Sequence, residues 1–301
     1  MLSSIFNNEL TVVDHAYIND YGKIIGGSFL PSFIVSGELD PVEKVVIDFS
    51  TVKKNIKNII DNHYFELEQN GLDHKLWIIE GYSLCEYILN TEGTINTIEI
   101  NTPCCKLILP LDAVKLIKGC LNYSISEIGK YMENFVETKL STKYFQKGIK
   151  VKCNNSTRPV LPLSNEPYSI FTYTHGLKDS TSYGCVNLAH GHLSYIQIKN
   201  GDIQILNEIA SYLNGAIIIN KANIINKSYN NITIGYTHPD RGEFFGSFQR
   251  DNNKLIILET ETTIEYIIEY ICEKFNLQEF DLYISEGLTK GAYLNSSKFN
   301  Q

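Results

Sequence analysis

The chain has 301 residues, of which 43% are hydrophobic and 20% are charged, so it is long enough to build about two globular domains. Its 26 basic and 34 acidic residues give a formal net charge of −8, and only three arginines occur, which weighs against a nucleic-acid partner. No apolar run approaches the length of a membrane span, and the N-terminal residues do not resemble a secretory signal. The seven cysteines form no CxxC motif, so we expect reduced thiols, a cytoplasmic location and no membrane partner.

A proline-rich segment divides the chain into two halves of similar length. Residues 154–167 contain Pro159, Pro162 and Pro167 among small polar residues, which is typical of an extended linker. We therefore expect a first unit at 1–153 and a second unit at 168–301. Each half can be read in the same order, namely strand, strand, helix, strands, helix, strand.

In the first half, residues 9–18 and 29–39 have the composition of strands, with a glycine-rich turn region between them. Ser50 is the expected N-cap of a helix, because apolar residues follow it at helical spacing from Val52 to Ile60. A second amphipathic helix is expected from about Ser124, and a strand at 149–153 closes this half.

In the second half, strands are expected at 169–175 and 192–198. A helix follows at 203–213, where apolar residues recur at helical spacing. Further strands include 254–258, and the apolar stripe from Ile264 to Phe275 predicts another helix. A short strand at 282–284 is the last expected element.

Three of the seven histidines fall close together in the second half. His190 and His192 lie two residues apart in a predicted strand, so both imidazoles project from the same face. His175 ends the preceding strand, and an antiparallel neighbour could bring it beside them. Three neutral imidazoles with an open fourth position form the ligand set of a catalytic zinc site. The alternative is that these are surface histidines or hydrogen-bonded core histidines.

Four further residues are candidates for chemistry. Cys185 lies between His175 and His190, where a divalent cation could lower its pKa and make it a base or nucleophile, although a small buried hydrophobic residue is the alternative. The adjacent pair Asp73 and His74 could transfer protons, or could be adjacent by chance. Glu286 could pair with the N–H edge of a heterocycle, or could face solvent.

Together these residues resemble the 6-pyruvoyltetrahydropterin synthase and 6-carboxytetrahydropterin synthase family, which is built on the tunnelling fold (T-fold). The second half matches the family's zinc histidine, catalytic cysteine and HGH motif with His175, Cys185 and the run from His190 to His192. Its closing strand carries Glu286 in SEGLTKGAY, which is similar to the family's pterin-anchoring glutamate motif.

The first half is similar to the middle of the family pattern. Asp48 and Phe49 with Lys53 resemble the DF…K helix, and residues 72–74 match the LDH motif. His15 stands near the end of the first predicted strand, but residues 26–28 read GGS where HGH is expected. The second half has no LDH motif, and the segments 79–123 and 216–258 match no feature of the family.

The two halves thus lack complementary parts of the pattern. In the family the site lies at a subunit interface, so a fused pair of T-folds can keep one complete site and lose the other. The sequence does not decide whether Asp73 and His74 serve the zinc of their own chain or of a neighbour. The resemblance implies an α+β fold of two tandem T-fold units, each an antiparallel sheet with helices on one face, assembled as a homotrimer.

The resemblance also implies a reaction. Zinc held by His175, His190 and His192 would bind the side chain of 7,8-dihydroneopterin triphosphate, a pterin substrate. Cys185 would act as the thiolate that removes a proton from the substrate side chain. His74, oriented by Asp73, would return a proton to the neighbouring carbon, and Glu286 would anchor the pterin ring. The expected product is 6-carboxytetrahydropterin, a precursor in 7-deazaguanine (queuosine-type) synthesis, formed by a carbon–oxygen lyase. The alternatives are a 6-pyruvoyl product, a related T-fold reaction such as that of the metal-free uricase, or a zinc- or pterin-binding protein without turnover.

Overall fold

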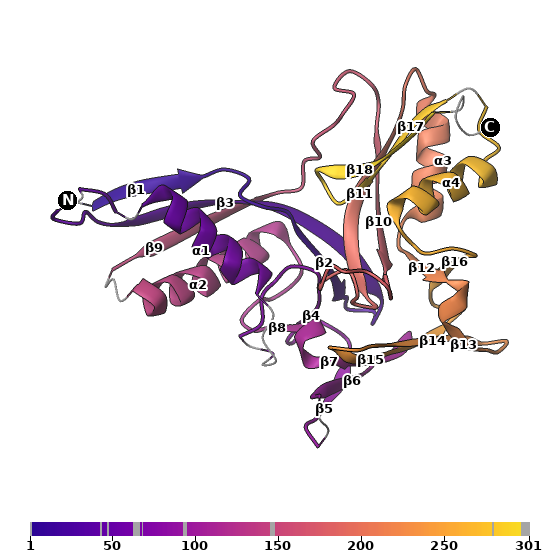
Figure 1. The fold of residues 1–301 in the computed structure, drawn as a ribbon, viewed down its shortest axis with the longest axis horizontal. Coiled ribbons are helices and arrows are strands. Elements are labelled where there is room, and N and C mark those ends of the chain that lie inside the picture. The colour runs from indigo at the N-terminus through magenta and orange to yellow at the C-terminus, as the bar shows by residue number, and fades with distance from the viewer. Residues whose placement is uncertain are drawn as a thin grey trace.

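The protein is described here from a computed structural model, which covers residues 2–42, 44–46, 48–62, 67, 69–92, 95–144, 148–278 and 280–295. Its described part contains four α-helices and three six-stranded sheets (Figure 1). The fold is therefore α+β, as the sequence predicts. No helix among the described residues is both long enough and apolar enough to cross a membrane.

The first sheet and its two helices come from the first half of the chain. In this sheet β1, β3, β2, β4 and β8 lie in that order, and β9 also pairs with β3. The elements are β1 (Leu2–Asn7), β2 (Val13–Ile18), β3 (Ile24–Glu38), α1 (Phe49–Asp61), β4 (Lys75–Ile79), β8 (Val114–Ile117), α2 (Ile125–Tyr144) and β9 (Lys150–Ser156).

The second sheet repeats this arrangement in the second half. Its order is β16-β12-β10-β11-β17-β18. The elements are β10 (Ser169–His175), β11 (His190–Ile198), α3 (Ile203–Leu213), β12 (Ala216–Asn220), β16 (Lys254–Leu258), α4 (Ile264–Lys274), β17 (Asp281–Glu286) and β18 (Lys290–Asn295). The chain β8, β4, β2, β3, β9 has the same sequence of parallel and antiparallel pairs as β16, β12, β10, β11, β17. The predicted repeat of element order is confirmed.

The first and second sheets are both mixed, so the prediction of an antiparallel sheet in each unit is wrong. The β2–β4, β4–β8, β10–β12 and β12–β16 pairs are all parallel. A helix-containing crossover explains two of them, because α1 stands between β3 and β4 and α3 stands between β11 and β12. After each crossover the chain pairs in parallel with the first strand of the preceding hairpin, so β4 lies beside β2 and β12 lies beside β10.

The third sheet combines strands from both halves and is built from the two segments that match no feature of the family. Its order is β13-β14-β15-β7-β6-β5, and the halves meet where β15 pairs antiparallel with β7. The elements are β5 (Glu86–Asn90), β6 (Thr97–Asn101), β7 (Cys105–Pro110), β13 (Ile224–Lys227), β14 (Asn231–His238) and β15 (Gly242–Gln249), with short 3-10 helices η1 (Leu111–Ala113) and η2 (Lys221–Asn223) beside them.

Three hydrophobic clusters hold these layers together. One packs the first sheet against α1 and α2, and a second packs the second sheet against α3 and α4. The third cluster contains buried residues of both halves, including Leu107, Leu188 and Phe248. Figure 1 shows the first sheet and its helices at the left, the second at the right and the third sheet below both. The two halves therefore share buried apolar surface.

Several boundaries differ from those expected. The side chain of Asp48, not Ser50, caps α1 by accepting a hydrogen bond from Thr51 N at 2.8 Å. The strand β9 continues to Ser156, into the segment predicted as linker, because its residues from Lys150 pair with β3. The division into units at 1–153 and 168–301 remains a prediction.

Candidate metal and proton-transfer site

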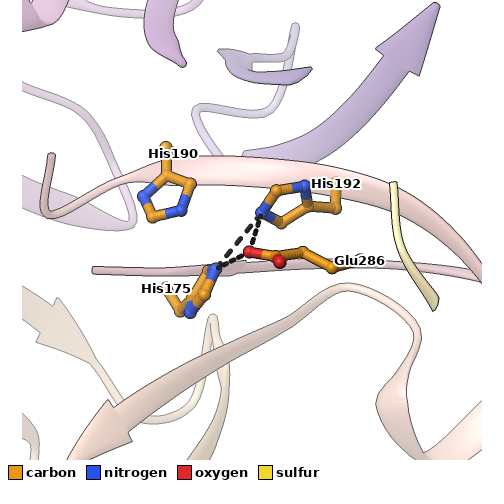
Figure 2. A group of neighbouring side chains, drawn as sticks. All are labelled: His175, His190, His192 and Glu286. Carbon is orange, nitrogen blue, oxygen red and sulfur yellow. Dashed lines mark hydrogen bonds and ion pairs between the residues drawn. The ribbon is translucent and has the colours of Figure 1, made fainter. Parts of the chain in front are cut away.

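The three candidate zinc ligands lie together on one face of the second sheet. In the β10–β11 register His175 pairs with His190, and Tyr173 pairs with His192, so all three imidazoles project from the same side. His175 Nε2 and His192 Nε2 are 3.2 Å apart. Ligand atoms of these histidines and of Glu286 all lie within 4.8 Å of one another (Figure 2). The arrangement of strands thus brings the predicted histidines to one point.

In His175 and His190 the opposite ring nitrogen has an acceptor that fixes the ring, and in His192 it faces a carboxylate. His175 Nδ1 donates to Thr262 O at 2.7 Å, and His190 Nδ1 donates to Asn187 O at 2.9 Å. Because a backbone carbonyl can only accept, these Nδ1 atoms carry the protons and Nε2 keeps its lone pair. His192 Nδ1 lies 3.3 Å from the Asp14 carboxylate. This is the outer shell expected of imidazoles that bind a metal through Nε2.

Burial keeps His175 and His190 neutral. All three side chains have 0% exposure. Burial, together with the neighbouring His192, lowers the pKa of His175 to about 3. Burial and the adjacent imidazoles hold the pKa of His190 well below its usual value. His190 Nε2 is buried without a hydrogen-bond partner, which is costly unless something else binds that lone pair. These residues fit a divalent cation bound by nitrogen donors, and the cluster could hold a metal.

Glu286, at the end of β17, belongs to the same donor set. Its Oε1 lies 3.6 Å from His192 Nε2 and 3.9 Å from His175 Nε2, and its Oε2 lies 3.6 Å from Lys290 Nζ. Burial alone would raise the pKa of Glu286, but its polar neighbours, with the Lys290 ammonium among them, outweigh burial and the pKa is lowered. The carboxylate stands between the histidines and the partly exposed Lys290. Its role as a ring anchor remains a prediction.

The Asp73–His74 pair of the first half reaches this site within the same chain. Ligand atoms of His74, Cys185 and His190 lie within 4.8 Å of one another, and the His74 and His190 rings are 5.3 Å apart. His74 Nε2 lies 3.6 Å from Asp73 Oδ2. His74 has a φ of 54°, a conformation rare outside glycine that clusters at functional sites. The candidate acid, base and metal ligands therefore meet in one chain.

These proton-transfer candidates are strongly affected by burial. Burial lowers the pKa of His74 to about 4 and raises the pKa of the Asp73 carboxyl well above its usual value. Burial also raises the pKa of the Cys185 thiol, with the Glu286 charge adding to the rise. With these residues alone Cys185 is a thiol and His74 a neutral imidazole, so moving the thiol proton to the imidazole is uphill unless a bound cation lowers the pKa of the thiol.

The two halves meet back to back at two glycines beside this site. A Cβ on Gly26 would lie 2.2 Å from Tyr173 O, and a Cβ on Gly191 would lie 2.6 Å from Gly26 Cα. Ser28 Oγ accepts a hydrogen bond from Leu193 N at 2.9 Å and donates to Asp14 Oδ1 at 2.5 Å. The GGS run of the first half is thus the surface against which the HGH run packs.

Among its described residues, the first half holds no equivalent metal site. Its β2–β3 register pairs Ala16 with Gly26 and Asp14 with Ser28, so the position equivalent to His175 is Ala16. His15, near the end of this strand, is therefore not the equivalent of His175. The His15 ring stacks on Trp77 at 3.7 Å, and its Nε2 is 2.9 Å from Tyr123 Oη. Strand alternation turns His15 to the opposite face from Ala16.

The second half likewise has no counterpart of His74. Lys75 pairs with His15 in parallel register, as Ile217 pairs with Thr174, so Ala216 occupies the position equivalent to His74. Ala16 and Ile217 belong to the shared apolar cluster. Buried apolar side chains therefore occupy part of the region where the second site would lie.

Some functional candidates were not found from the sequence. Asp14, Thr262 and Asn187 contact the histidines, and Lys290 pairs with Glu286. Lys290 also borders a cavity of about 390 Å³ between the linker and the β17–β18 hairpin. No sequence motif marks these residues. They could have been found only from the way the strands pair, which places them next to the histidines.

No protein-family model, no curated protein and no solved structure matches this chain significantly. What the site does must therefore be argued from its own residues.

Proposed function

We propose that the protein is a zinc-dependent lyase that converts 7,8-dihydroneopterin triphosphate and water to 6-carboxytetrahydropterin, acetaldehyde and triphosphate. The observation that carries the proposal is the meeting of His74 and Cys185 beside three converging imidazoles in one chain. Residues that the family pattern places on neighbouring subunits are here contributed by the two halves of a single chain.

The histidines supply the metal-binding part of the proposal. His175, His190 and His192 would hold the zinc through Nε2, with their Nδ1 atoms fixed as described. A bound zinc ion supplies Lewis-acid chemistry, which lowers the pKa of substrate hydroxyls by stabilising negative charge on oxygen. Three protein nitrogen donors that leave the fourth position to water or substrate are typical of catalytic rather than structural zinc, and on this proposal Glu286 binds the substrate instead of the metal.

Cys185 and His74 supply the proton transfers. The Cys185 thiol gives its proton to His74, and the resulting thiolate takes a proton from the substrate side chain. His74 returns a proton to the neighbouring carbon, and Asp73, 3.6 Å away, orients the imidazole. Cys185 is 9% exposed and the His74 side chain is 14% exposed, which limits competition from water.

Glu286 and Lys290 lie toward the exposed side of this site and suit the rest of the substrate. The Glu286 carboxylate can accept hydrogen bonds from the N–H edge of a pterin ring, and Lys290 can offset the charge of a phosphate group. We also propose a homotrimer, because of the resemblance to the T-fold family, and a cytoplasmic location, because of the cysteine pattern.

The test is to incubate the purified, zinc-loaded protein with dihydroneopterin triphosphate and to identify the products by mass spectrometry. We expect 6-carboxytetrahydropterin with acetaldehyde. A pyruvoyl product would keep the proton transfers and change the pathway. If one zinc ion binds per chain and no substrate is consumed, the protein is a binding protein and the proposal is wrong.

A matched pair of cysteine variants makes the test sharper. Cys185→Ala should abolish turnover and keep the zinc content, because the thiol is not needed to complete the three-histidine ligand set. Cys272→Ala, which changes a buried thiol of α4 away from the site, should keep turnover. Equal activity in both variants would remove Cys185 from the mechanism.

A further inference from the structure

A buried ionic cluster lies behind Cys185 and is not used by the proposed chemistry. Arg241 and Asp112 are each 1% exposed, and Arg241 Nη2 donates to Asp112 Oδ1 at 2.8 Å. Burying such a pair has a desolvation cost that often exceeds its attraction, so stability alone is a weak reason for it. Asp112 lies in η1 of the first half, whereas Arg241 lies in the turn between β14 and β15 of the second half.

Both members of the pair hold Tyr183, two residues before Cys185. Arg241 Nη1 donates to Tyr183 O at 2.6 Å, and the guanidinium lies 4.0 Å from the centre of the Tyr183 ring. The Tyr183 hydroxyl donates to the other oxygen of the Asp112 carboxylate. The residue is therefore fixed at its carbonyl, its ring and its hydroxyl.

The same hairpin holds the chain on the other side of Cys185. Tyr236 on β14 donates from its hydroxyl to Val186 O at 2.7 Å, and its side chain is 7% exposed. Arg241 and Tyr236 thus hold the residues two before and one after the thiol. The third sheet, which is built by both halves, presents these two side chains to the loop.

Asp112 also fixes the position of His74. Lys75, the next residue after His74, is fully buried and donates from Nζ to Asp112 O at 2.6 Å. The loop runs directly against the imidazole, because a Cβ on Gly184 would lie 2.5 Å from His74 Cβ. One residue therefore holds both chain segments that carry the proton-transfer pair.

We propose that Arg241, Asp112, Tyr183 and Tyr236 form a clamp that positions the Cys185 thiol against His74. The four are positioning residues, because they act through the loop and through Lys75. The inference rests on the proposed function, and it gives the third sheet a role in that function. A displacement of about 1 Å between reacting groups can cost about 100-fold in rate, so the clamp matters even though it lies behind the site.

The test uses Tyr183→Phe and Tyr236→Phe, each of which removes one hydroxyl and keeps the ring. Tyr212→Phe is the matched control, because it removes a hydroxyl that bonds Tyr270 Oη at 2.6 Å in the helix layer. We expect kcat to fall about 10-fold to 100-fold in both clamp variants, with KM and zinc content unchanged. The control should keep the wild-type kcat.

A second measurement does not depend on turnover. The rate at which iodoacetamide alkylates Cys185, followed by peptide mass spectrometry at fixed pH, reports how often the loop opens. Cys185 is 9% exposed, and we expect its alkylation to become about tenfold faster in the clamp variants and to stay unchanged in the control.

The two readouts separate the two proposals. If the wild type has no turnover but the clamp variants speed alkylation of Cys185, the clamp stands and the proposed function fails. Wild-type kcat and alkylation rates in both folded clamp variants would overturn the clamp. A fall in kcat that comes with equal loss of zinc or a raised KM would also overturn it, because that pattern indicates general structural damage.

Discussion

The outer-shell carboxylate of Asp14 offers a graded test of the metal site. Asp14 Oδ1 lies 3.3 Å from His192 Nδ1 and is almost fully buried. Outer-shell partners of this kind contribute about 10-fold to 100-fold to metal affinity, or about 1.4 to 2.7 kcal/mol. Asp14→Asn keeps an oxygen that can accept from Nδ1 and removes only the charge. Asp14→Ala leaves Nδ1 without an acceptor.

We therefore expect zinc affinity to fall about tenfold in Asp14→Asn and about 100-fold in Asp14→Ala. The measurement is competition for zinc with a chromophoric chelator at constant pH. Asp281→Asn is the control, because it changes an aspartate on β17 that accepts a hydrogen bond from Tyr293 Oη at 2.7 Å away from the histidines. Affinities of both Asp14 variants within twofold of the wild type would refute the assignment of His192 as a ligand held by Asp14.

Two further predictions concern the packing of the halves and the dependence of stability on pH. Gly26→Ala would place a Cβ 2.2 Å from Tyr173 O, so we expect the free energy of unfolding, measured by denaturant titration, to fall by about 1–3 kcal/mol or more. Gly129→Ala in α2 is the control, because its Cβ would lie 3.4 Å from the nearest atom, and it should be neutral or stabilising. An equal effect of both changes would argue against the close contact of the hairpins. Burial lowers the pKa of His15 to about 3 in the folded protein, below its unfolded value near 6.5. Between these two pH values only the unfolded chain binds the extra proton, so the stability of the metal-free protein falls as the pH drops through this range. His15→Phe should lower the slope of the free energy of unfolding against pH, near pH 5, by about 1.4 kcal/mol per pH unit. An unchanged slope would contradict the neutral state of His15.

The sequence was most informative where a pattern is local. The spacing of His190 and His192, with His175 on the neighbouring strand, predicted a cluster that the register of β10 and β11 produces. Helical periodicity predicted α3 and α4 closely, since apolar residues at that spacing pack on one sheet face. The repeat of element order was likewise predictable, because both halves use the same local signals in the same order.

The misses depend on contacts between distant segments. The face on which His15 lies could not be predicted, because a shift of one residue in a strand turns a side chain to the other face and only pairing with β3 fixes that register. The third sheet was not predicted, since β7 and β15 are far apart in the chain and their pairing leaves no local signal. Asp112, Arg241 and Tyr183 were missed for the same reason.

The central claim is that one chain contains a complete site contributed by both of its halves. The most direct test mixes Cys185→Ala with His74→Ala, dissociates and reassembles the two variants together, and measures turnover of dihydroneopterin triphosphate. Neither variant alone should be active, and the mixture should stay inactive because no chain holds both groups. If the site instead lay between neighbouring chains, random reassembly would restore about one quarter of the wild-type rate, and that result would contradict the claim.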